Sequence, residues 1–470
     1  MTIRPPRIRL ITFSVLFVAT LSSCAGTPTI SNTVQVKHIG NEVKNPTATN
    51  SKLVGGGGKD WARTVICKKD GSCAIFGYGI KSWGESTDYF AAMESPAQQL
   101  LWARSYGGTN KDVLSTATTS PNGGYLLIGT SESLFFTAMK VIGPNRPPRP
   151  FVLNIDAAGN PLWAETVDSD VQEFLGVRAT RDGNYILAGF TFSEESASGK
   201  GRGIAITKIS PEGEVIWAYR YDIGFTAYGR DIAIDQDGSL TVLGGLKRDK
   251  DVKQEILLLK LTKDGDIISA QSYAGETHLI PHCLSLDEGR GFSFAGASKS
   301  TEGKTDSIWF RGAADGSLTT SVIYEGPQGS QIFSSNQGFD NDWVLAGRIG
   351  DGKKALADGF AMLVTSNGNV KAFLAISGEG NDEVMSVSRL SAGKYRLFGD
   401  TENFQAKDMD MFEIDWVPDT ATVQSTFSQG TLKVVVSGAE VSRKAMTPTI
   451  RHVGASLLEV RTLMINQAMP

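Results

Sequence analysis

The feature that most constrains the fold of this chain is a unit of roughly 50 to 60 residues that occurs seven times. In each copy a mostly apolar segment ends in glycine, as in Ala74-Ile75-Phe76-Gly77 and Val344-Leu345-Ala346-Gly347. We term these residues the anchor glycines: Gly77, Gly129, Gly189, Gly244, Gly296, Gly347 and Gly399. Successive anchor glycines are 52, 60, 55, 52, 51 and 52 residues apart. Such a period predicts an array of similar supersecondary units.

Each unit is expected to contain four antiparallel strands. An alternating segment precedes the anchored strand, and Asn122-Gly123 or Asp182-Gly183 between the two is typical of a tight hairpin. Two further strands follow. The last begins with a Trp in several units, namely Trp102, Trp163 and Trp217, and we expect these side chains to pack between units. The pattern predicts an all-β fold, a seven-bladed β-propeller of four-stranded antiparallel blades, because a ring of sheets buries faces that no single sheet can cover. An array of β-sandwiches or a β-solenoid is the alternative.

The first residues resemble a bacterial export signal. Arg4, Arg7 and Arg9 precede an apolar run, Leu10–Leu21, that is too short to remain as a membrane-spanning helix. The run ends in Leu21-Ser22-Ser23-Cys24, which resembles the lipobox of bacterial lipoproteins. The resemblance implies cleavage before Cys24 and lipidation of that residue, and Ala25 after it favours the outer membrane. An ordinary secretory signal or a signal anchor is the alternative.

These features predict four regions. They are a lipoprotein signal peptide over 1–23, a lipidated Cys24 and flexible tether over 24–58, a propeller over 59–428 and a C-terminal β extension over 429–470. The tether follows from a composition rich in Thr, Asn, Ser and Gly, with Thr33–Val36 as a stray strand. Thr422–Phe427 is expected to complete the seventh blade. The extension contains strands that no blade requires, so it is expected to cover an edge or brace the ring.

One segment resembles a known group of propellers. Asp156-Ala157-Ala158-Gly159-Asn160-Pro161-Leu162-Trp163 is similar to the repeat of quinoprotein-like propellers. With the lipobox, the chain resembles the propeller lipoprotein of the outer-membrane barrel-assembly machinery. The resemblance spans about residues 59–416 and implies a propeller in the cell envelope. That group usually has eight blades, and the Trp position holds Ser269, Thr320 and Ala372 in later units of this chain.

No catalytic, cofactor or metal site is predicted. His278 and His282, with Cys283 adjacent, share a strand face, but about 13 Å would separate the two imidazoles along an extended strand. That distance is too long for both to bind one ion. A net charge of −4 provides no broad basic field, so we expect no nucleic-acid partner.

Two pairs of residues are candidate sites of other kinds. Cys67 and Cys73 flank a hairpin turn, and in an exported chain they are expected to form a disulfide, with two buried thiols as the alternative. Arg146 and Arg149 lie in a basic, proline-rich insertion that is a candidate partner loop. The favoured function is an outer-membrane-anchored propeller lipoprotein, not an enzyme, that acts as a protein-binding scaffold in a cell-envelope assembly. The alternative is a quinone-, carbohydrate- or metal-binding propeller enzyme.

Overall fold

A computed structural model describes most of the chain beyond residue 32. It covers 33–467 apart from 39–47, 56–57, 80–85, 109, 134–147, 169, 193–200, 225, 250–251, 288–290, 327, 351–355, 391–392, 403–408, 421–427, 440, 447–448, 453–458 and 463. The predicted signal peptide over 1–23 and Cys24 therefore lie outside the described residues. Within the described segments no helix is long and apolar enough to cross a membrane.

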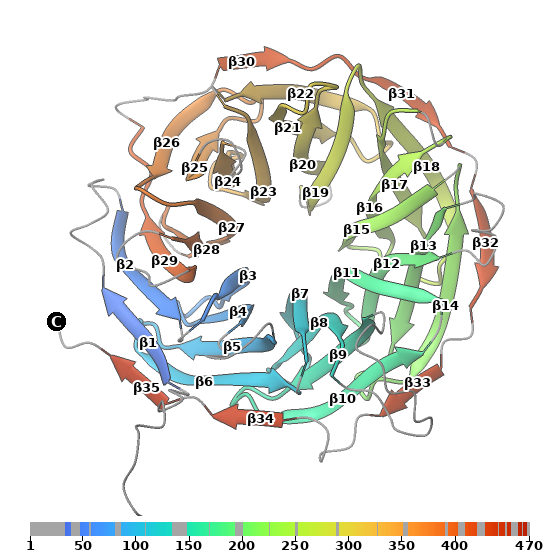
Figure 1. Ribbon diagram of the computed structural model, residues 1–470. Coiled ribbons are helices and arrows are strands. Elements are labelled where there is room, and N and C mark those ends of the chain that lie inside the picture. The colour runs from blue at the N-terminus through green and yellow to red at the C-terminus, as the bar shows by residue number, and fades with distance from the viewer. Residues whose placement is uncertain are drawn as a thin grey trace, which may run out of the picture. The chain divides into compact units, whose positions relative to one another are not determined.

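Seven sheets stand around a common centre, which confirms the predicted all-β, seven-bladed β-propeller (Figure 1). The first strands of blades 1 to 7 are β3 (Trp61–Cys67), β7 (Asp112–Thr119), β11 (Val171–Ala179), β15 (Thr226–Ile234), β19 (His278–Leu286), β23 (Ser330–Gln337) and β27 (Asp382–Arg389). The second strands are β4 (Cys73–Gly79), β8 (Tyr125–Ser131), β12 (Tyr185–Phe192), β16 (Leu240–Lys247), β20 (Phe292–Lys299), β24 (Trp343–Ile349) and β28 (Tyr395–Thr401).

The two outer strands of each blade follow. The third strands are β5 (Asp88–Glu94), β9 (Arg149–Ile155), β13 (Arg202–Ile209), β17 (Glu255–Leu261), β21 (Thr305–Gly312), β25 (Asp358–Val364) and β29 (Asp410–Trp416). The fourth strands of blades 1 to 6 are β6 (Leu100–Gly107), β10 (Pro161–Asp168), β14 (Val215–Asp222), β18 (Ile267–Ala274), β22 (Leu318–Glu325) and β26 (Val370–Ile376). Because neighbouring first strands contact one another in a closed cycle from β3 to β27 and back, the ring is complete.

The core is divided among the interfaces between blades. Seven apolar clusters each join residues of two adjacent blades, such as Leu126 of blade 2 with Leu187 of blade 3. The second strands lie between neighbours on both faces, and in β20 the run Phe292–Ser298 is buried throughout. Burial on both faces explains why these strands are near-continuous apolar runs in the sequence.

Blade 7 is completed from the other end of the chain. β2 (Ala48–Gly55) pairs antiparallel with β29 and supplies the fourth strand of this blade. β1 (Thr33–His38) then pairs with β2 as a fifth strand. β1 contains the predicted stray strand Thr33–Val36, whereas the flexible tether does not extend over Ala48–Gly55, because cross-strand pairing there overrides a polar composition. Thr422–Phe427, which we expected in this position, lies outside the described residues, and β2 occupies the place.

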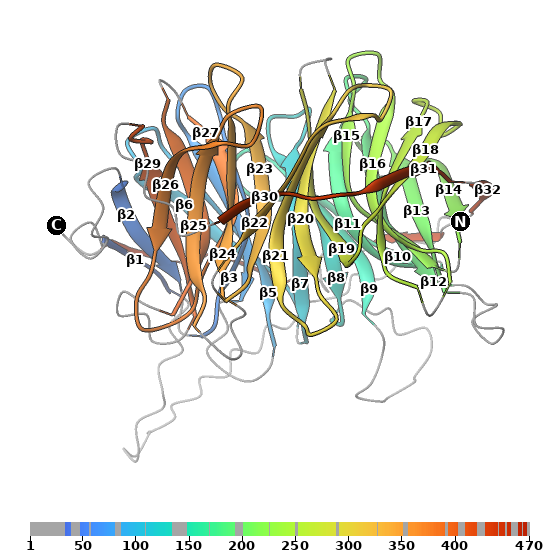
Figure 2. The same ribbon diagram turned by 90° about the horizontal axis from the view of Figure 1, so that it is seen from above.

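The C-terminal segment forms a belt around the outer edges of the blades. Its strands are β30 (Ser428–Thr431) on blade 5, β31 (Val435–Gly438) on blade 4, β32 (Ser442–Ala445) on blade 3, β33 (Thr449–His452) on blade 2 and β34 (Glu459–Thr462) on blade 1. β35 (Met464–Gln467) then pairs in parallel with β1. The belt runs against the blade order, and Figure 2 shows β30 and β31 crossing the outside of the ring. Added strands of this kind cover hydrogen-bonding edges that would otherwise be open.

A repeated tyrosine also joins neighbouring blades. Tyr221 in a fourth strand donates a hydrogen bond to the carbonyl of Gly265 in the next blade, at 2.7 Å. Equivalent bonds run from Tyr106 to Gly159, from Tyr273 to Gly316 and from Tyr324 to Gly368. Trp102 and Trp163 likewise donate to the turn of the following blade, at the carbonyls of Ala157 and Pro211.

Candidate functional site

Every first strand contains a β-bulge at the same place, and β11 has a second one near its start. The pairing register between first and second strands shifts by one residue in all seven blades. The extra residues, which we term the inner bulge residues, are Arg63, Ser115, Leu175, Arg230, His282, Phe333 and Met385. Each lies 14 residues before the anchor glycine of its blade. Bulges re-aim side chains, and here all seven line one central cavity.

The bulge explains why the anchor position must be glycine. A Cβ atom added to Gly296 would lie 1.9 Å from the carbonyl oxygen of Ile280 in the bulged strand. The same distance, 1.9 Å, separates a Cβ on Gly347 from the Gln331 carbonyl oxygen. No side chain tolerates such a contact, so the anchor position requires glycine. The glycines that define the sequence repeat therefore also permit the bulges that line the channel.

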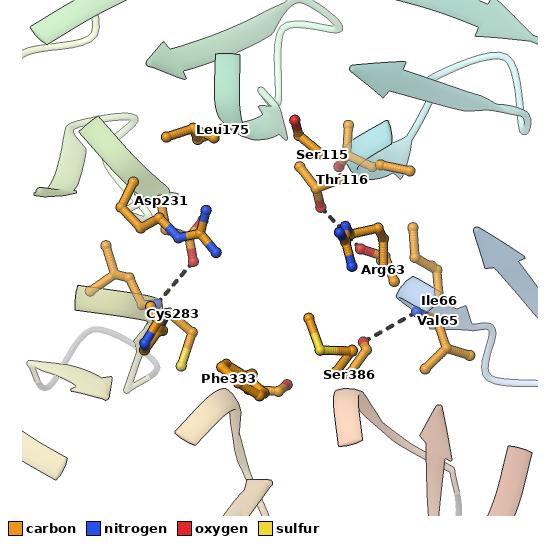
Figure 3. A pocket seen from close by; sticks show the side chains of 18 of the residues that line it. Arg63, Val65, Ile66, Ser115, Thr116, Leu175, Asp231, Cys283, Phe333 and Ser386 are labelled. Atoms are coloured by element: carbon orange, nitrogen blue, oxygen red, sulfur yellow. Dashed lines mark hydrogen bonds between the residues drawn. The ribbon is translucent and has the colours of Figure 1, made fainter. Parts of the chain in front are cut away.

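The central cavity has a volume of about 530 Å³ and is formed by the first strands (Figure 3). Polar residues beside the bulges join these strands to one another. The Thr64 and Thr116 hydroxyl oxygens are 3.0 Å apart, and Ser386 Oγ accepts a hydrogen bond of 3.2 Å from the Val65 amide. Ser334 Oγ accepts an equivalent bond from Val387. These hydroxyls hold the wall together, and the bulge residues remain to face the interior.

The charged groups of the cavity are three arginines and two carboxylates: Arg63, Arg178, Arg230, Glu173 and Asp231. Arg178 Nη2 lies 3.0 Å from Asp231 Oδ1, and Asp231 Oδ2 accepts a bond of 2.9 Å from the Leu284 amide. Ser115 Oγ donates to Glu173 Oε1 at 3.3 Å. Burial raises the pKa of Glu173, although this hydrogen bond and the charge of Arg230 oppose the shift.

The two histidines considered as metal ligands have separate surroundings. His282 lies in the cavity wall, where burial and the charges of Arg230 and Arg348 lower its pKa to about 3, so the imidazole is neutral. His278 Nδ1 instead accepts a hydrogen bond of 3.1 Å from the Gln254 amide. Burial raises the pKa of the neighbouring Cys283 thiol to about 12. Across the described residues, no three His, Cys, Asp or Glu side chains are grouped closely enough to hold a metal ion.

The other predicted site residues are two cysteines and two arginines, and those that the structure describes lie outside the cavity wall. Cys67 and Cys73 are joined by a disulfide, with a Cα–Cα distance of 4.1 Å, at the turn between β3 and β4. Arg149 is the half-buried first residue of β9 and lies opposite Ser131 in β8. Arg146 lies outside the described residues.

A second set of bulges faces the periphery. In blades 1 to 6 the register between third and fourth strands shifts near the start of the fourth strand. The extra residues are Leu101, Leu162, Ile216, Ile268, Thr319 and Lys371. We term the four apolar ones, in blades 1 to 4, the outer arc, and their exposed fractions are 57%, 51%, 49% and 51%. Neither the inner bulge residues nor the outer ones were predicted from the sequence, because a bulge is defined by how two strands pair.

The belt leaves the edge beside the outer arc open. β34 pairs with Arg104–Gly107 of β6, and β33 pairs with Glu165–Asp168 of β10. In both blades only the second half of the fourth strand is covered. In the described part of the chain, the backbone next to Leu101 and Leu162 therefore has no partner strand on its outer side.

No protein-family model matches the chain, and no curated protein matches it. Among solved structures, the chain is similar to the polysaccharide lyase Uly1, at 9% identity and a TM-score of 0.43, with 78% of this chain and 90% of that one covered. Sqt1 from Chaetomium thermophilum matches at 11% identity and a TM-score of 0.42, with 73% and 80% covered. A gluconolactonase from Xanthomonas campestris, XC5397, matches at 11% identity and a TM-score of 0.33, with 82% and 94% covered. At this level of similarity none of their activities transfers to this chain.

Proposed function

We propose that this protein is a lipid-anchored propeller of the cell envelope that binds a protein partner as a scaffold and is not an enzyme. The observation that carries the proposal is the outer arc. A bulge residue that faces water has no need to be apolar, and Thr319 and Lys371 occupy the same position in blades 5 and 6. The same exposed position is apolar in four successive blades, and we take this repetition as the mark of a surface that a partner covers.

The backbone beside the arc supports the same proposal. Open strand edges accept an added strand from another protein, and alternating apolar side chains then supply specificity. The partner we propose is an envelope protein with an apolar or extended segment. The lipid on Cys24 holds the propeller at the membrane, where the lipobox resemblance favours the outer membrane.

The arc can be tested with matched surface variants. A photo-reactive residue at Leu162 should cross-link one partner in intact membranes, and Leu162→Lys with Ile216→Lys should abolish recovery of that partner. The control is Val252→Lys with Leu356→Lys, since these residues are also apolar and exposed, at 40% and 52%, but lie in loops between second and third strands. Equal recovery with both double variants, or no cross-linked partner, would contradict the scaffold proposal.

The anchor is tested separately. Cys24→Ala should release the protein from membranes and abolish labelling with a palmitate analogue. If the wild-type chain takes up no label, the lipid anchor is wrong, and the outcome for the outer arc is unaffected.

A further inference from the structure

Arg230 is the one arginine of the central cavity that the described chain leaves without a hydrogen-bond or ion-pair partner. Arg178 is paired with Asp231, and Arg63 donates to the Ala62 carbonyl and to Tyr78 Oη, both at 2.8 Å. Glu173 interacts with Arg230 through space but forms no ion pair with it. The guanidinium of Arg230 is half-buried and lines the cavity, and its five N–H donors can bond to a ligand there.

A second unsatisfied group belongs to the next blade. His282 Nε2 is buried and has no hydrogen-bond partner among the described residues. His282 and Arg230 are both inner bulge residues, occupy neighbouring blades and interact electrostatically. His282 also forms a side-chain hydrogen bond with Gln331, and its Nε2 is covered, so Arg230 is the group of this pair that is open to the cavity.

The rest of the ring is partly apolar. Leu175, Phe333 and Met385 occupy the inner bulge positions of blades 3, 6 and 7. The Phe333 ring packs edge-on against His282, with 5.3 Å between the ring centroids. The cavity volume of about 530 Å³ is within the usual range for small-molecule sites.

We propose that the central channel binds a small organic anion with an apolar body. Its carboxylate, or a similar negative group, bonds to Arg230, and its apolar part lies against Phe333 and Met385. The excess of one arginine over the carboxylates of the cavity wall favours an anion over a neutral ligand. This ligand site is independent of the outer arc and of the lipid anchor.

The test uses phenylacetate as the probe and phenylacetamide as its uncharged counterpart. Both are titrated into the purified full chain at low salt and neutral pH by calorimetry. We expect saturable binding of phenylacetate at one site and at least tenfold weaker binding of the amide. Arg230→Met should weaken phenylacetate binding at least tenfold, and Arg230→Lys should restore part of it.

The matched control is Arg181→Met. Arg181 lies in an exposed turn and donates to the Gln236 carbonyl, so its replacement should leave binding unchanged. If Arg230→Met does not fold, Arg230→Gln provides the same comparison. The proposal is overturned if phenylacetate shows no saturable binding, if the amide binds equally well, or if loss of the Arg230 charge has no effect on affinity.

Discussion

Lys52 of β2 and Glu413 of β29 lie directly opposite each other, with Lys52 Nζ 2.8 Å from Glu413 Oε2. Both side chains are 1% exposed. Lys52 also bonds to Glu94 of blade 1, and Arg396 bonds to Glu94 and Asp415. The buried ion network therefore joins the N-terminal strand to blade 7 and to the first blade, at the point where the ring closes.

Lys52→Met should destabilise the protein by about 3–5 kcal/mol, because it removes one of the two cations that the buried carboxylates of Glu94 and Glu413 share, Lys52 and Arg396. The measurement is the urea midpoint of unfolding. Lys304→Met is the control, since Lys304 pairs with Asp306 at 3.1 Å but is 46% exposed. Loss of the Lys304 charge should lower the free energy of unfolding by less than about 1 kcal/mol. Equal midpoints for the two variants would argue against the role of the network in closure.

Gly296→Ala should lower the melting temperature, because the new Cβ would displace the bulged strand of blade 5 from β20. Overpacking of this kind costs about 1–3 kcal/mol or more. Gly275→Ala is the matched change, since its Cβ would meet only the flexible Leu279 methyl groups, at 3.3 and 3.4 Å. A melting temperature of Gly296→Ala as high as that of Gly275→Ala would show that the anchor glycines are not required by the bulge.

The stability of the ring should fall as pH rises. Burial, with a smaller contribution from Glu383, raises the pKa of Asp400 from 3.8 to about 8, although Arg63 and the Ala62 amide oppose the shift. The folded state then retains a proton that the unfolded chain releases above about pH 4. The free energy of unfolding should therefore fall by up to about 1.4 kcal/mol per pH unit from this residue between pH 4 and 8.

Asp400→Asn should make that slope shallower, because the amide does not titrate and its oxygen still accepts from Ala62. The comparison is the urea midpoint at pH 5 and pH 8. Asp315→Asn is the control, because hydrogen bonds to Ser317 lower the pKa of Asp315 and its titration lies below this window. An Asp400→Asn slope identical to wild type would contradict the assignment.

Tyr221→Phe should destabilise the protein by about 1 kcal/mol, since it removes the hydrogen bond to the Gly265 carbonyl and leaves that carbonyl buried. Tyr219→Phe tests the hydroxyl alone, because Tyr219 stacks on Trp217 and makes no hydrogen bond through its hydroxyl in the described structure. Its unfolding free energy should match wild type. A similar loss in both variants would contradict a specific role for the hydrogen bond from Tyr221 to Gly265.

The sequence predicted the blades because each carries its own local signals: an apolar run, a glycine and a turn. β2 has only Leu53 and Val54 as large apolar residues, and Lys52 is buried beside partners that lie far away in the sequence. The belt strands are four residues long and pair with blades that precede them by up to several hundred residues. Local pattern did not identify β2, and it predicted extra strands in the C-terminal extension without showing which blades they pair with, because distant pairing fixes both elements.

The channel was only partly predictable. The constant offset between Arg63 and Gly77, or His282 and Gly296, is present in the sequence. Its meaning depends on the one-residue register shift, which becomes visible only when both strands are paired. The tyrosine bonds to the following blade were missed for the same reason, although Tyr106 and Tyr221 each lie four residues after a Trp.

The position of β1 on the rim of blade 7 limits how far a lipidated protein can move. Eight residues, 25–32, separate Cys24 from the start of this strand. They span at most about 30 Å when fully extended. If Cys24 carries the proposed lipid, this side of blade 7 stays close to the membrane, and blades 3 and 4, which carry Ile216 and Ile268, lie on the opposite side of the ring.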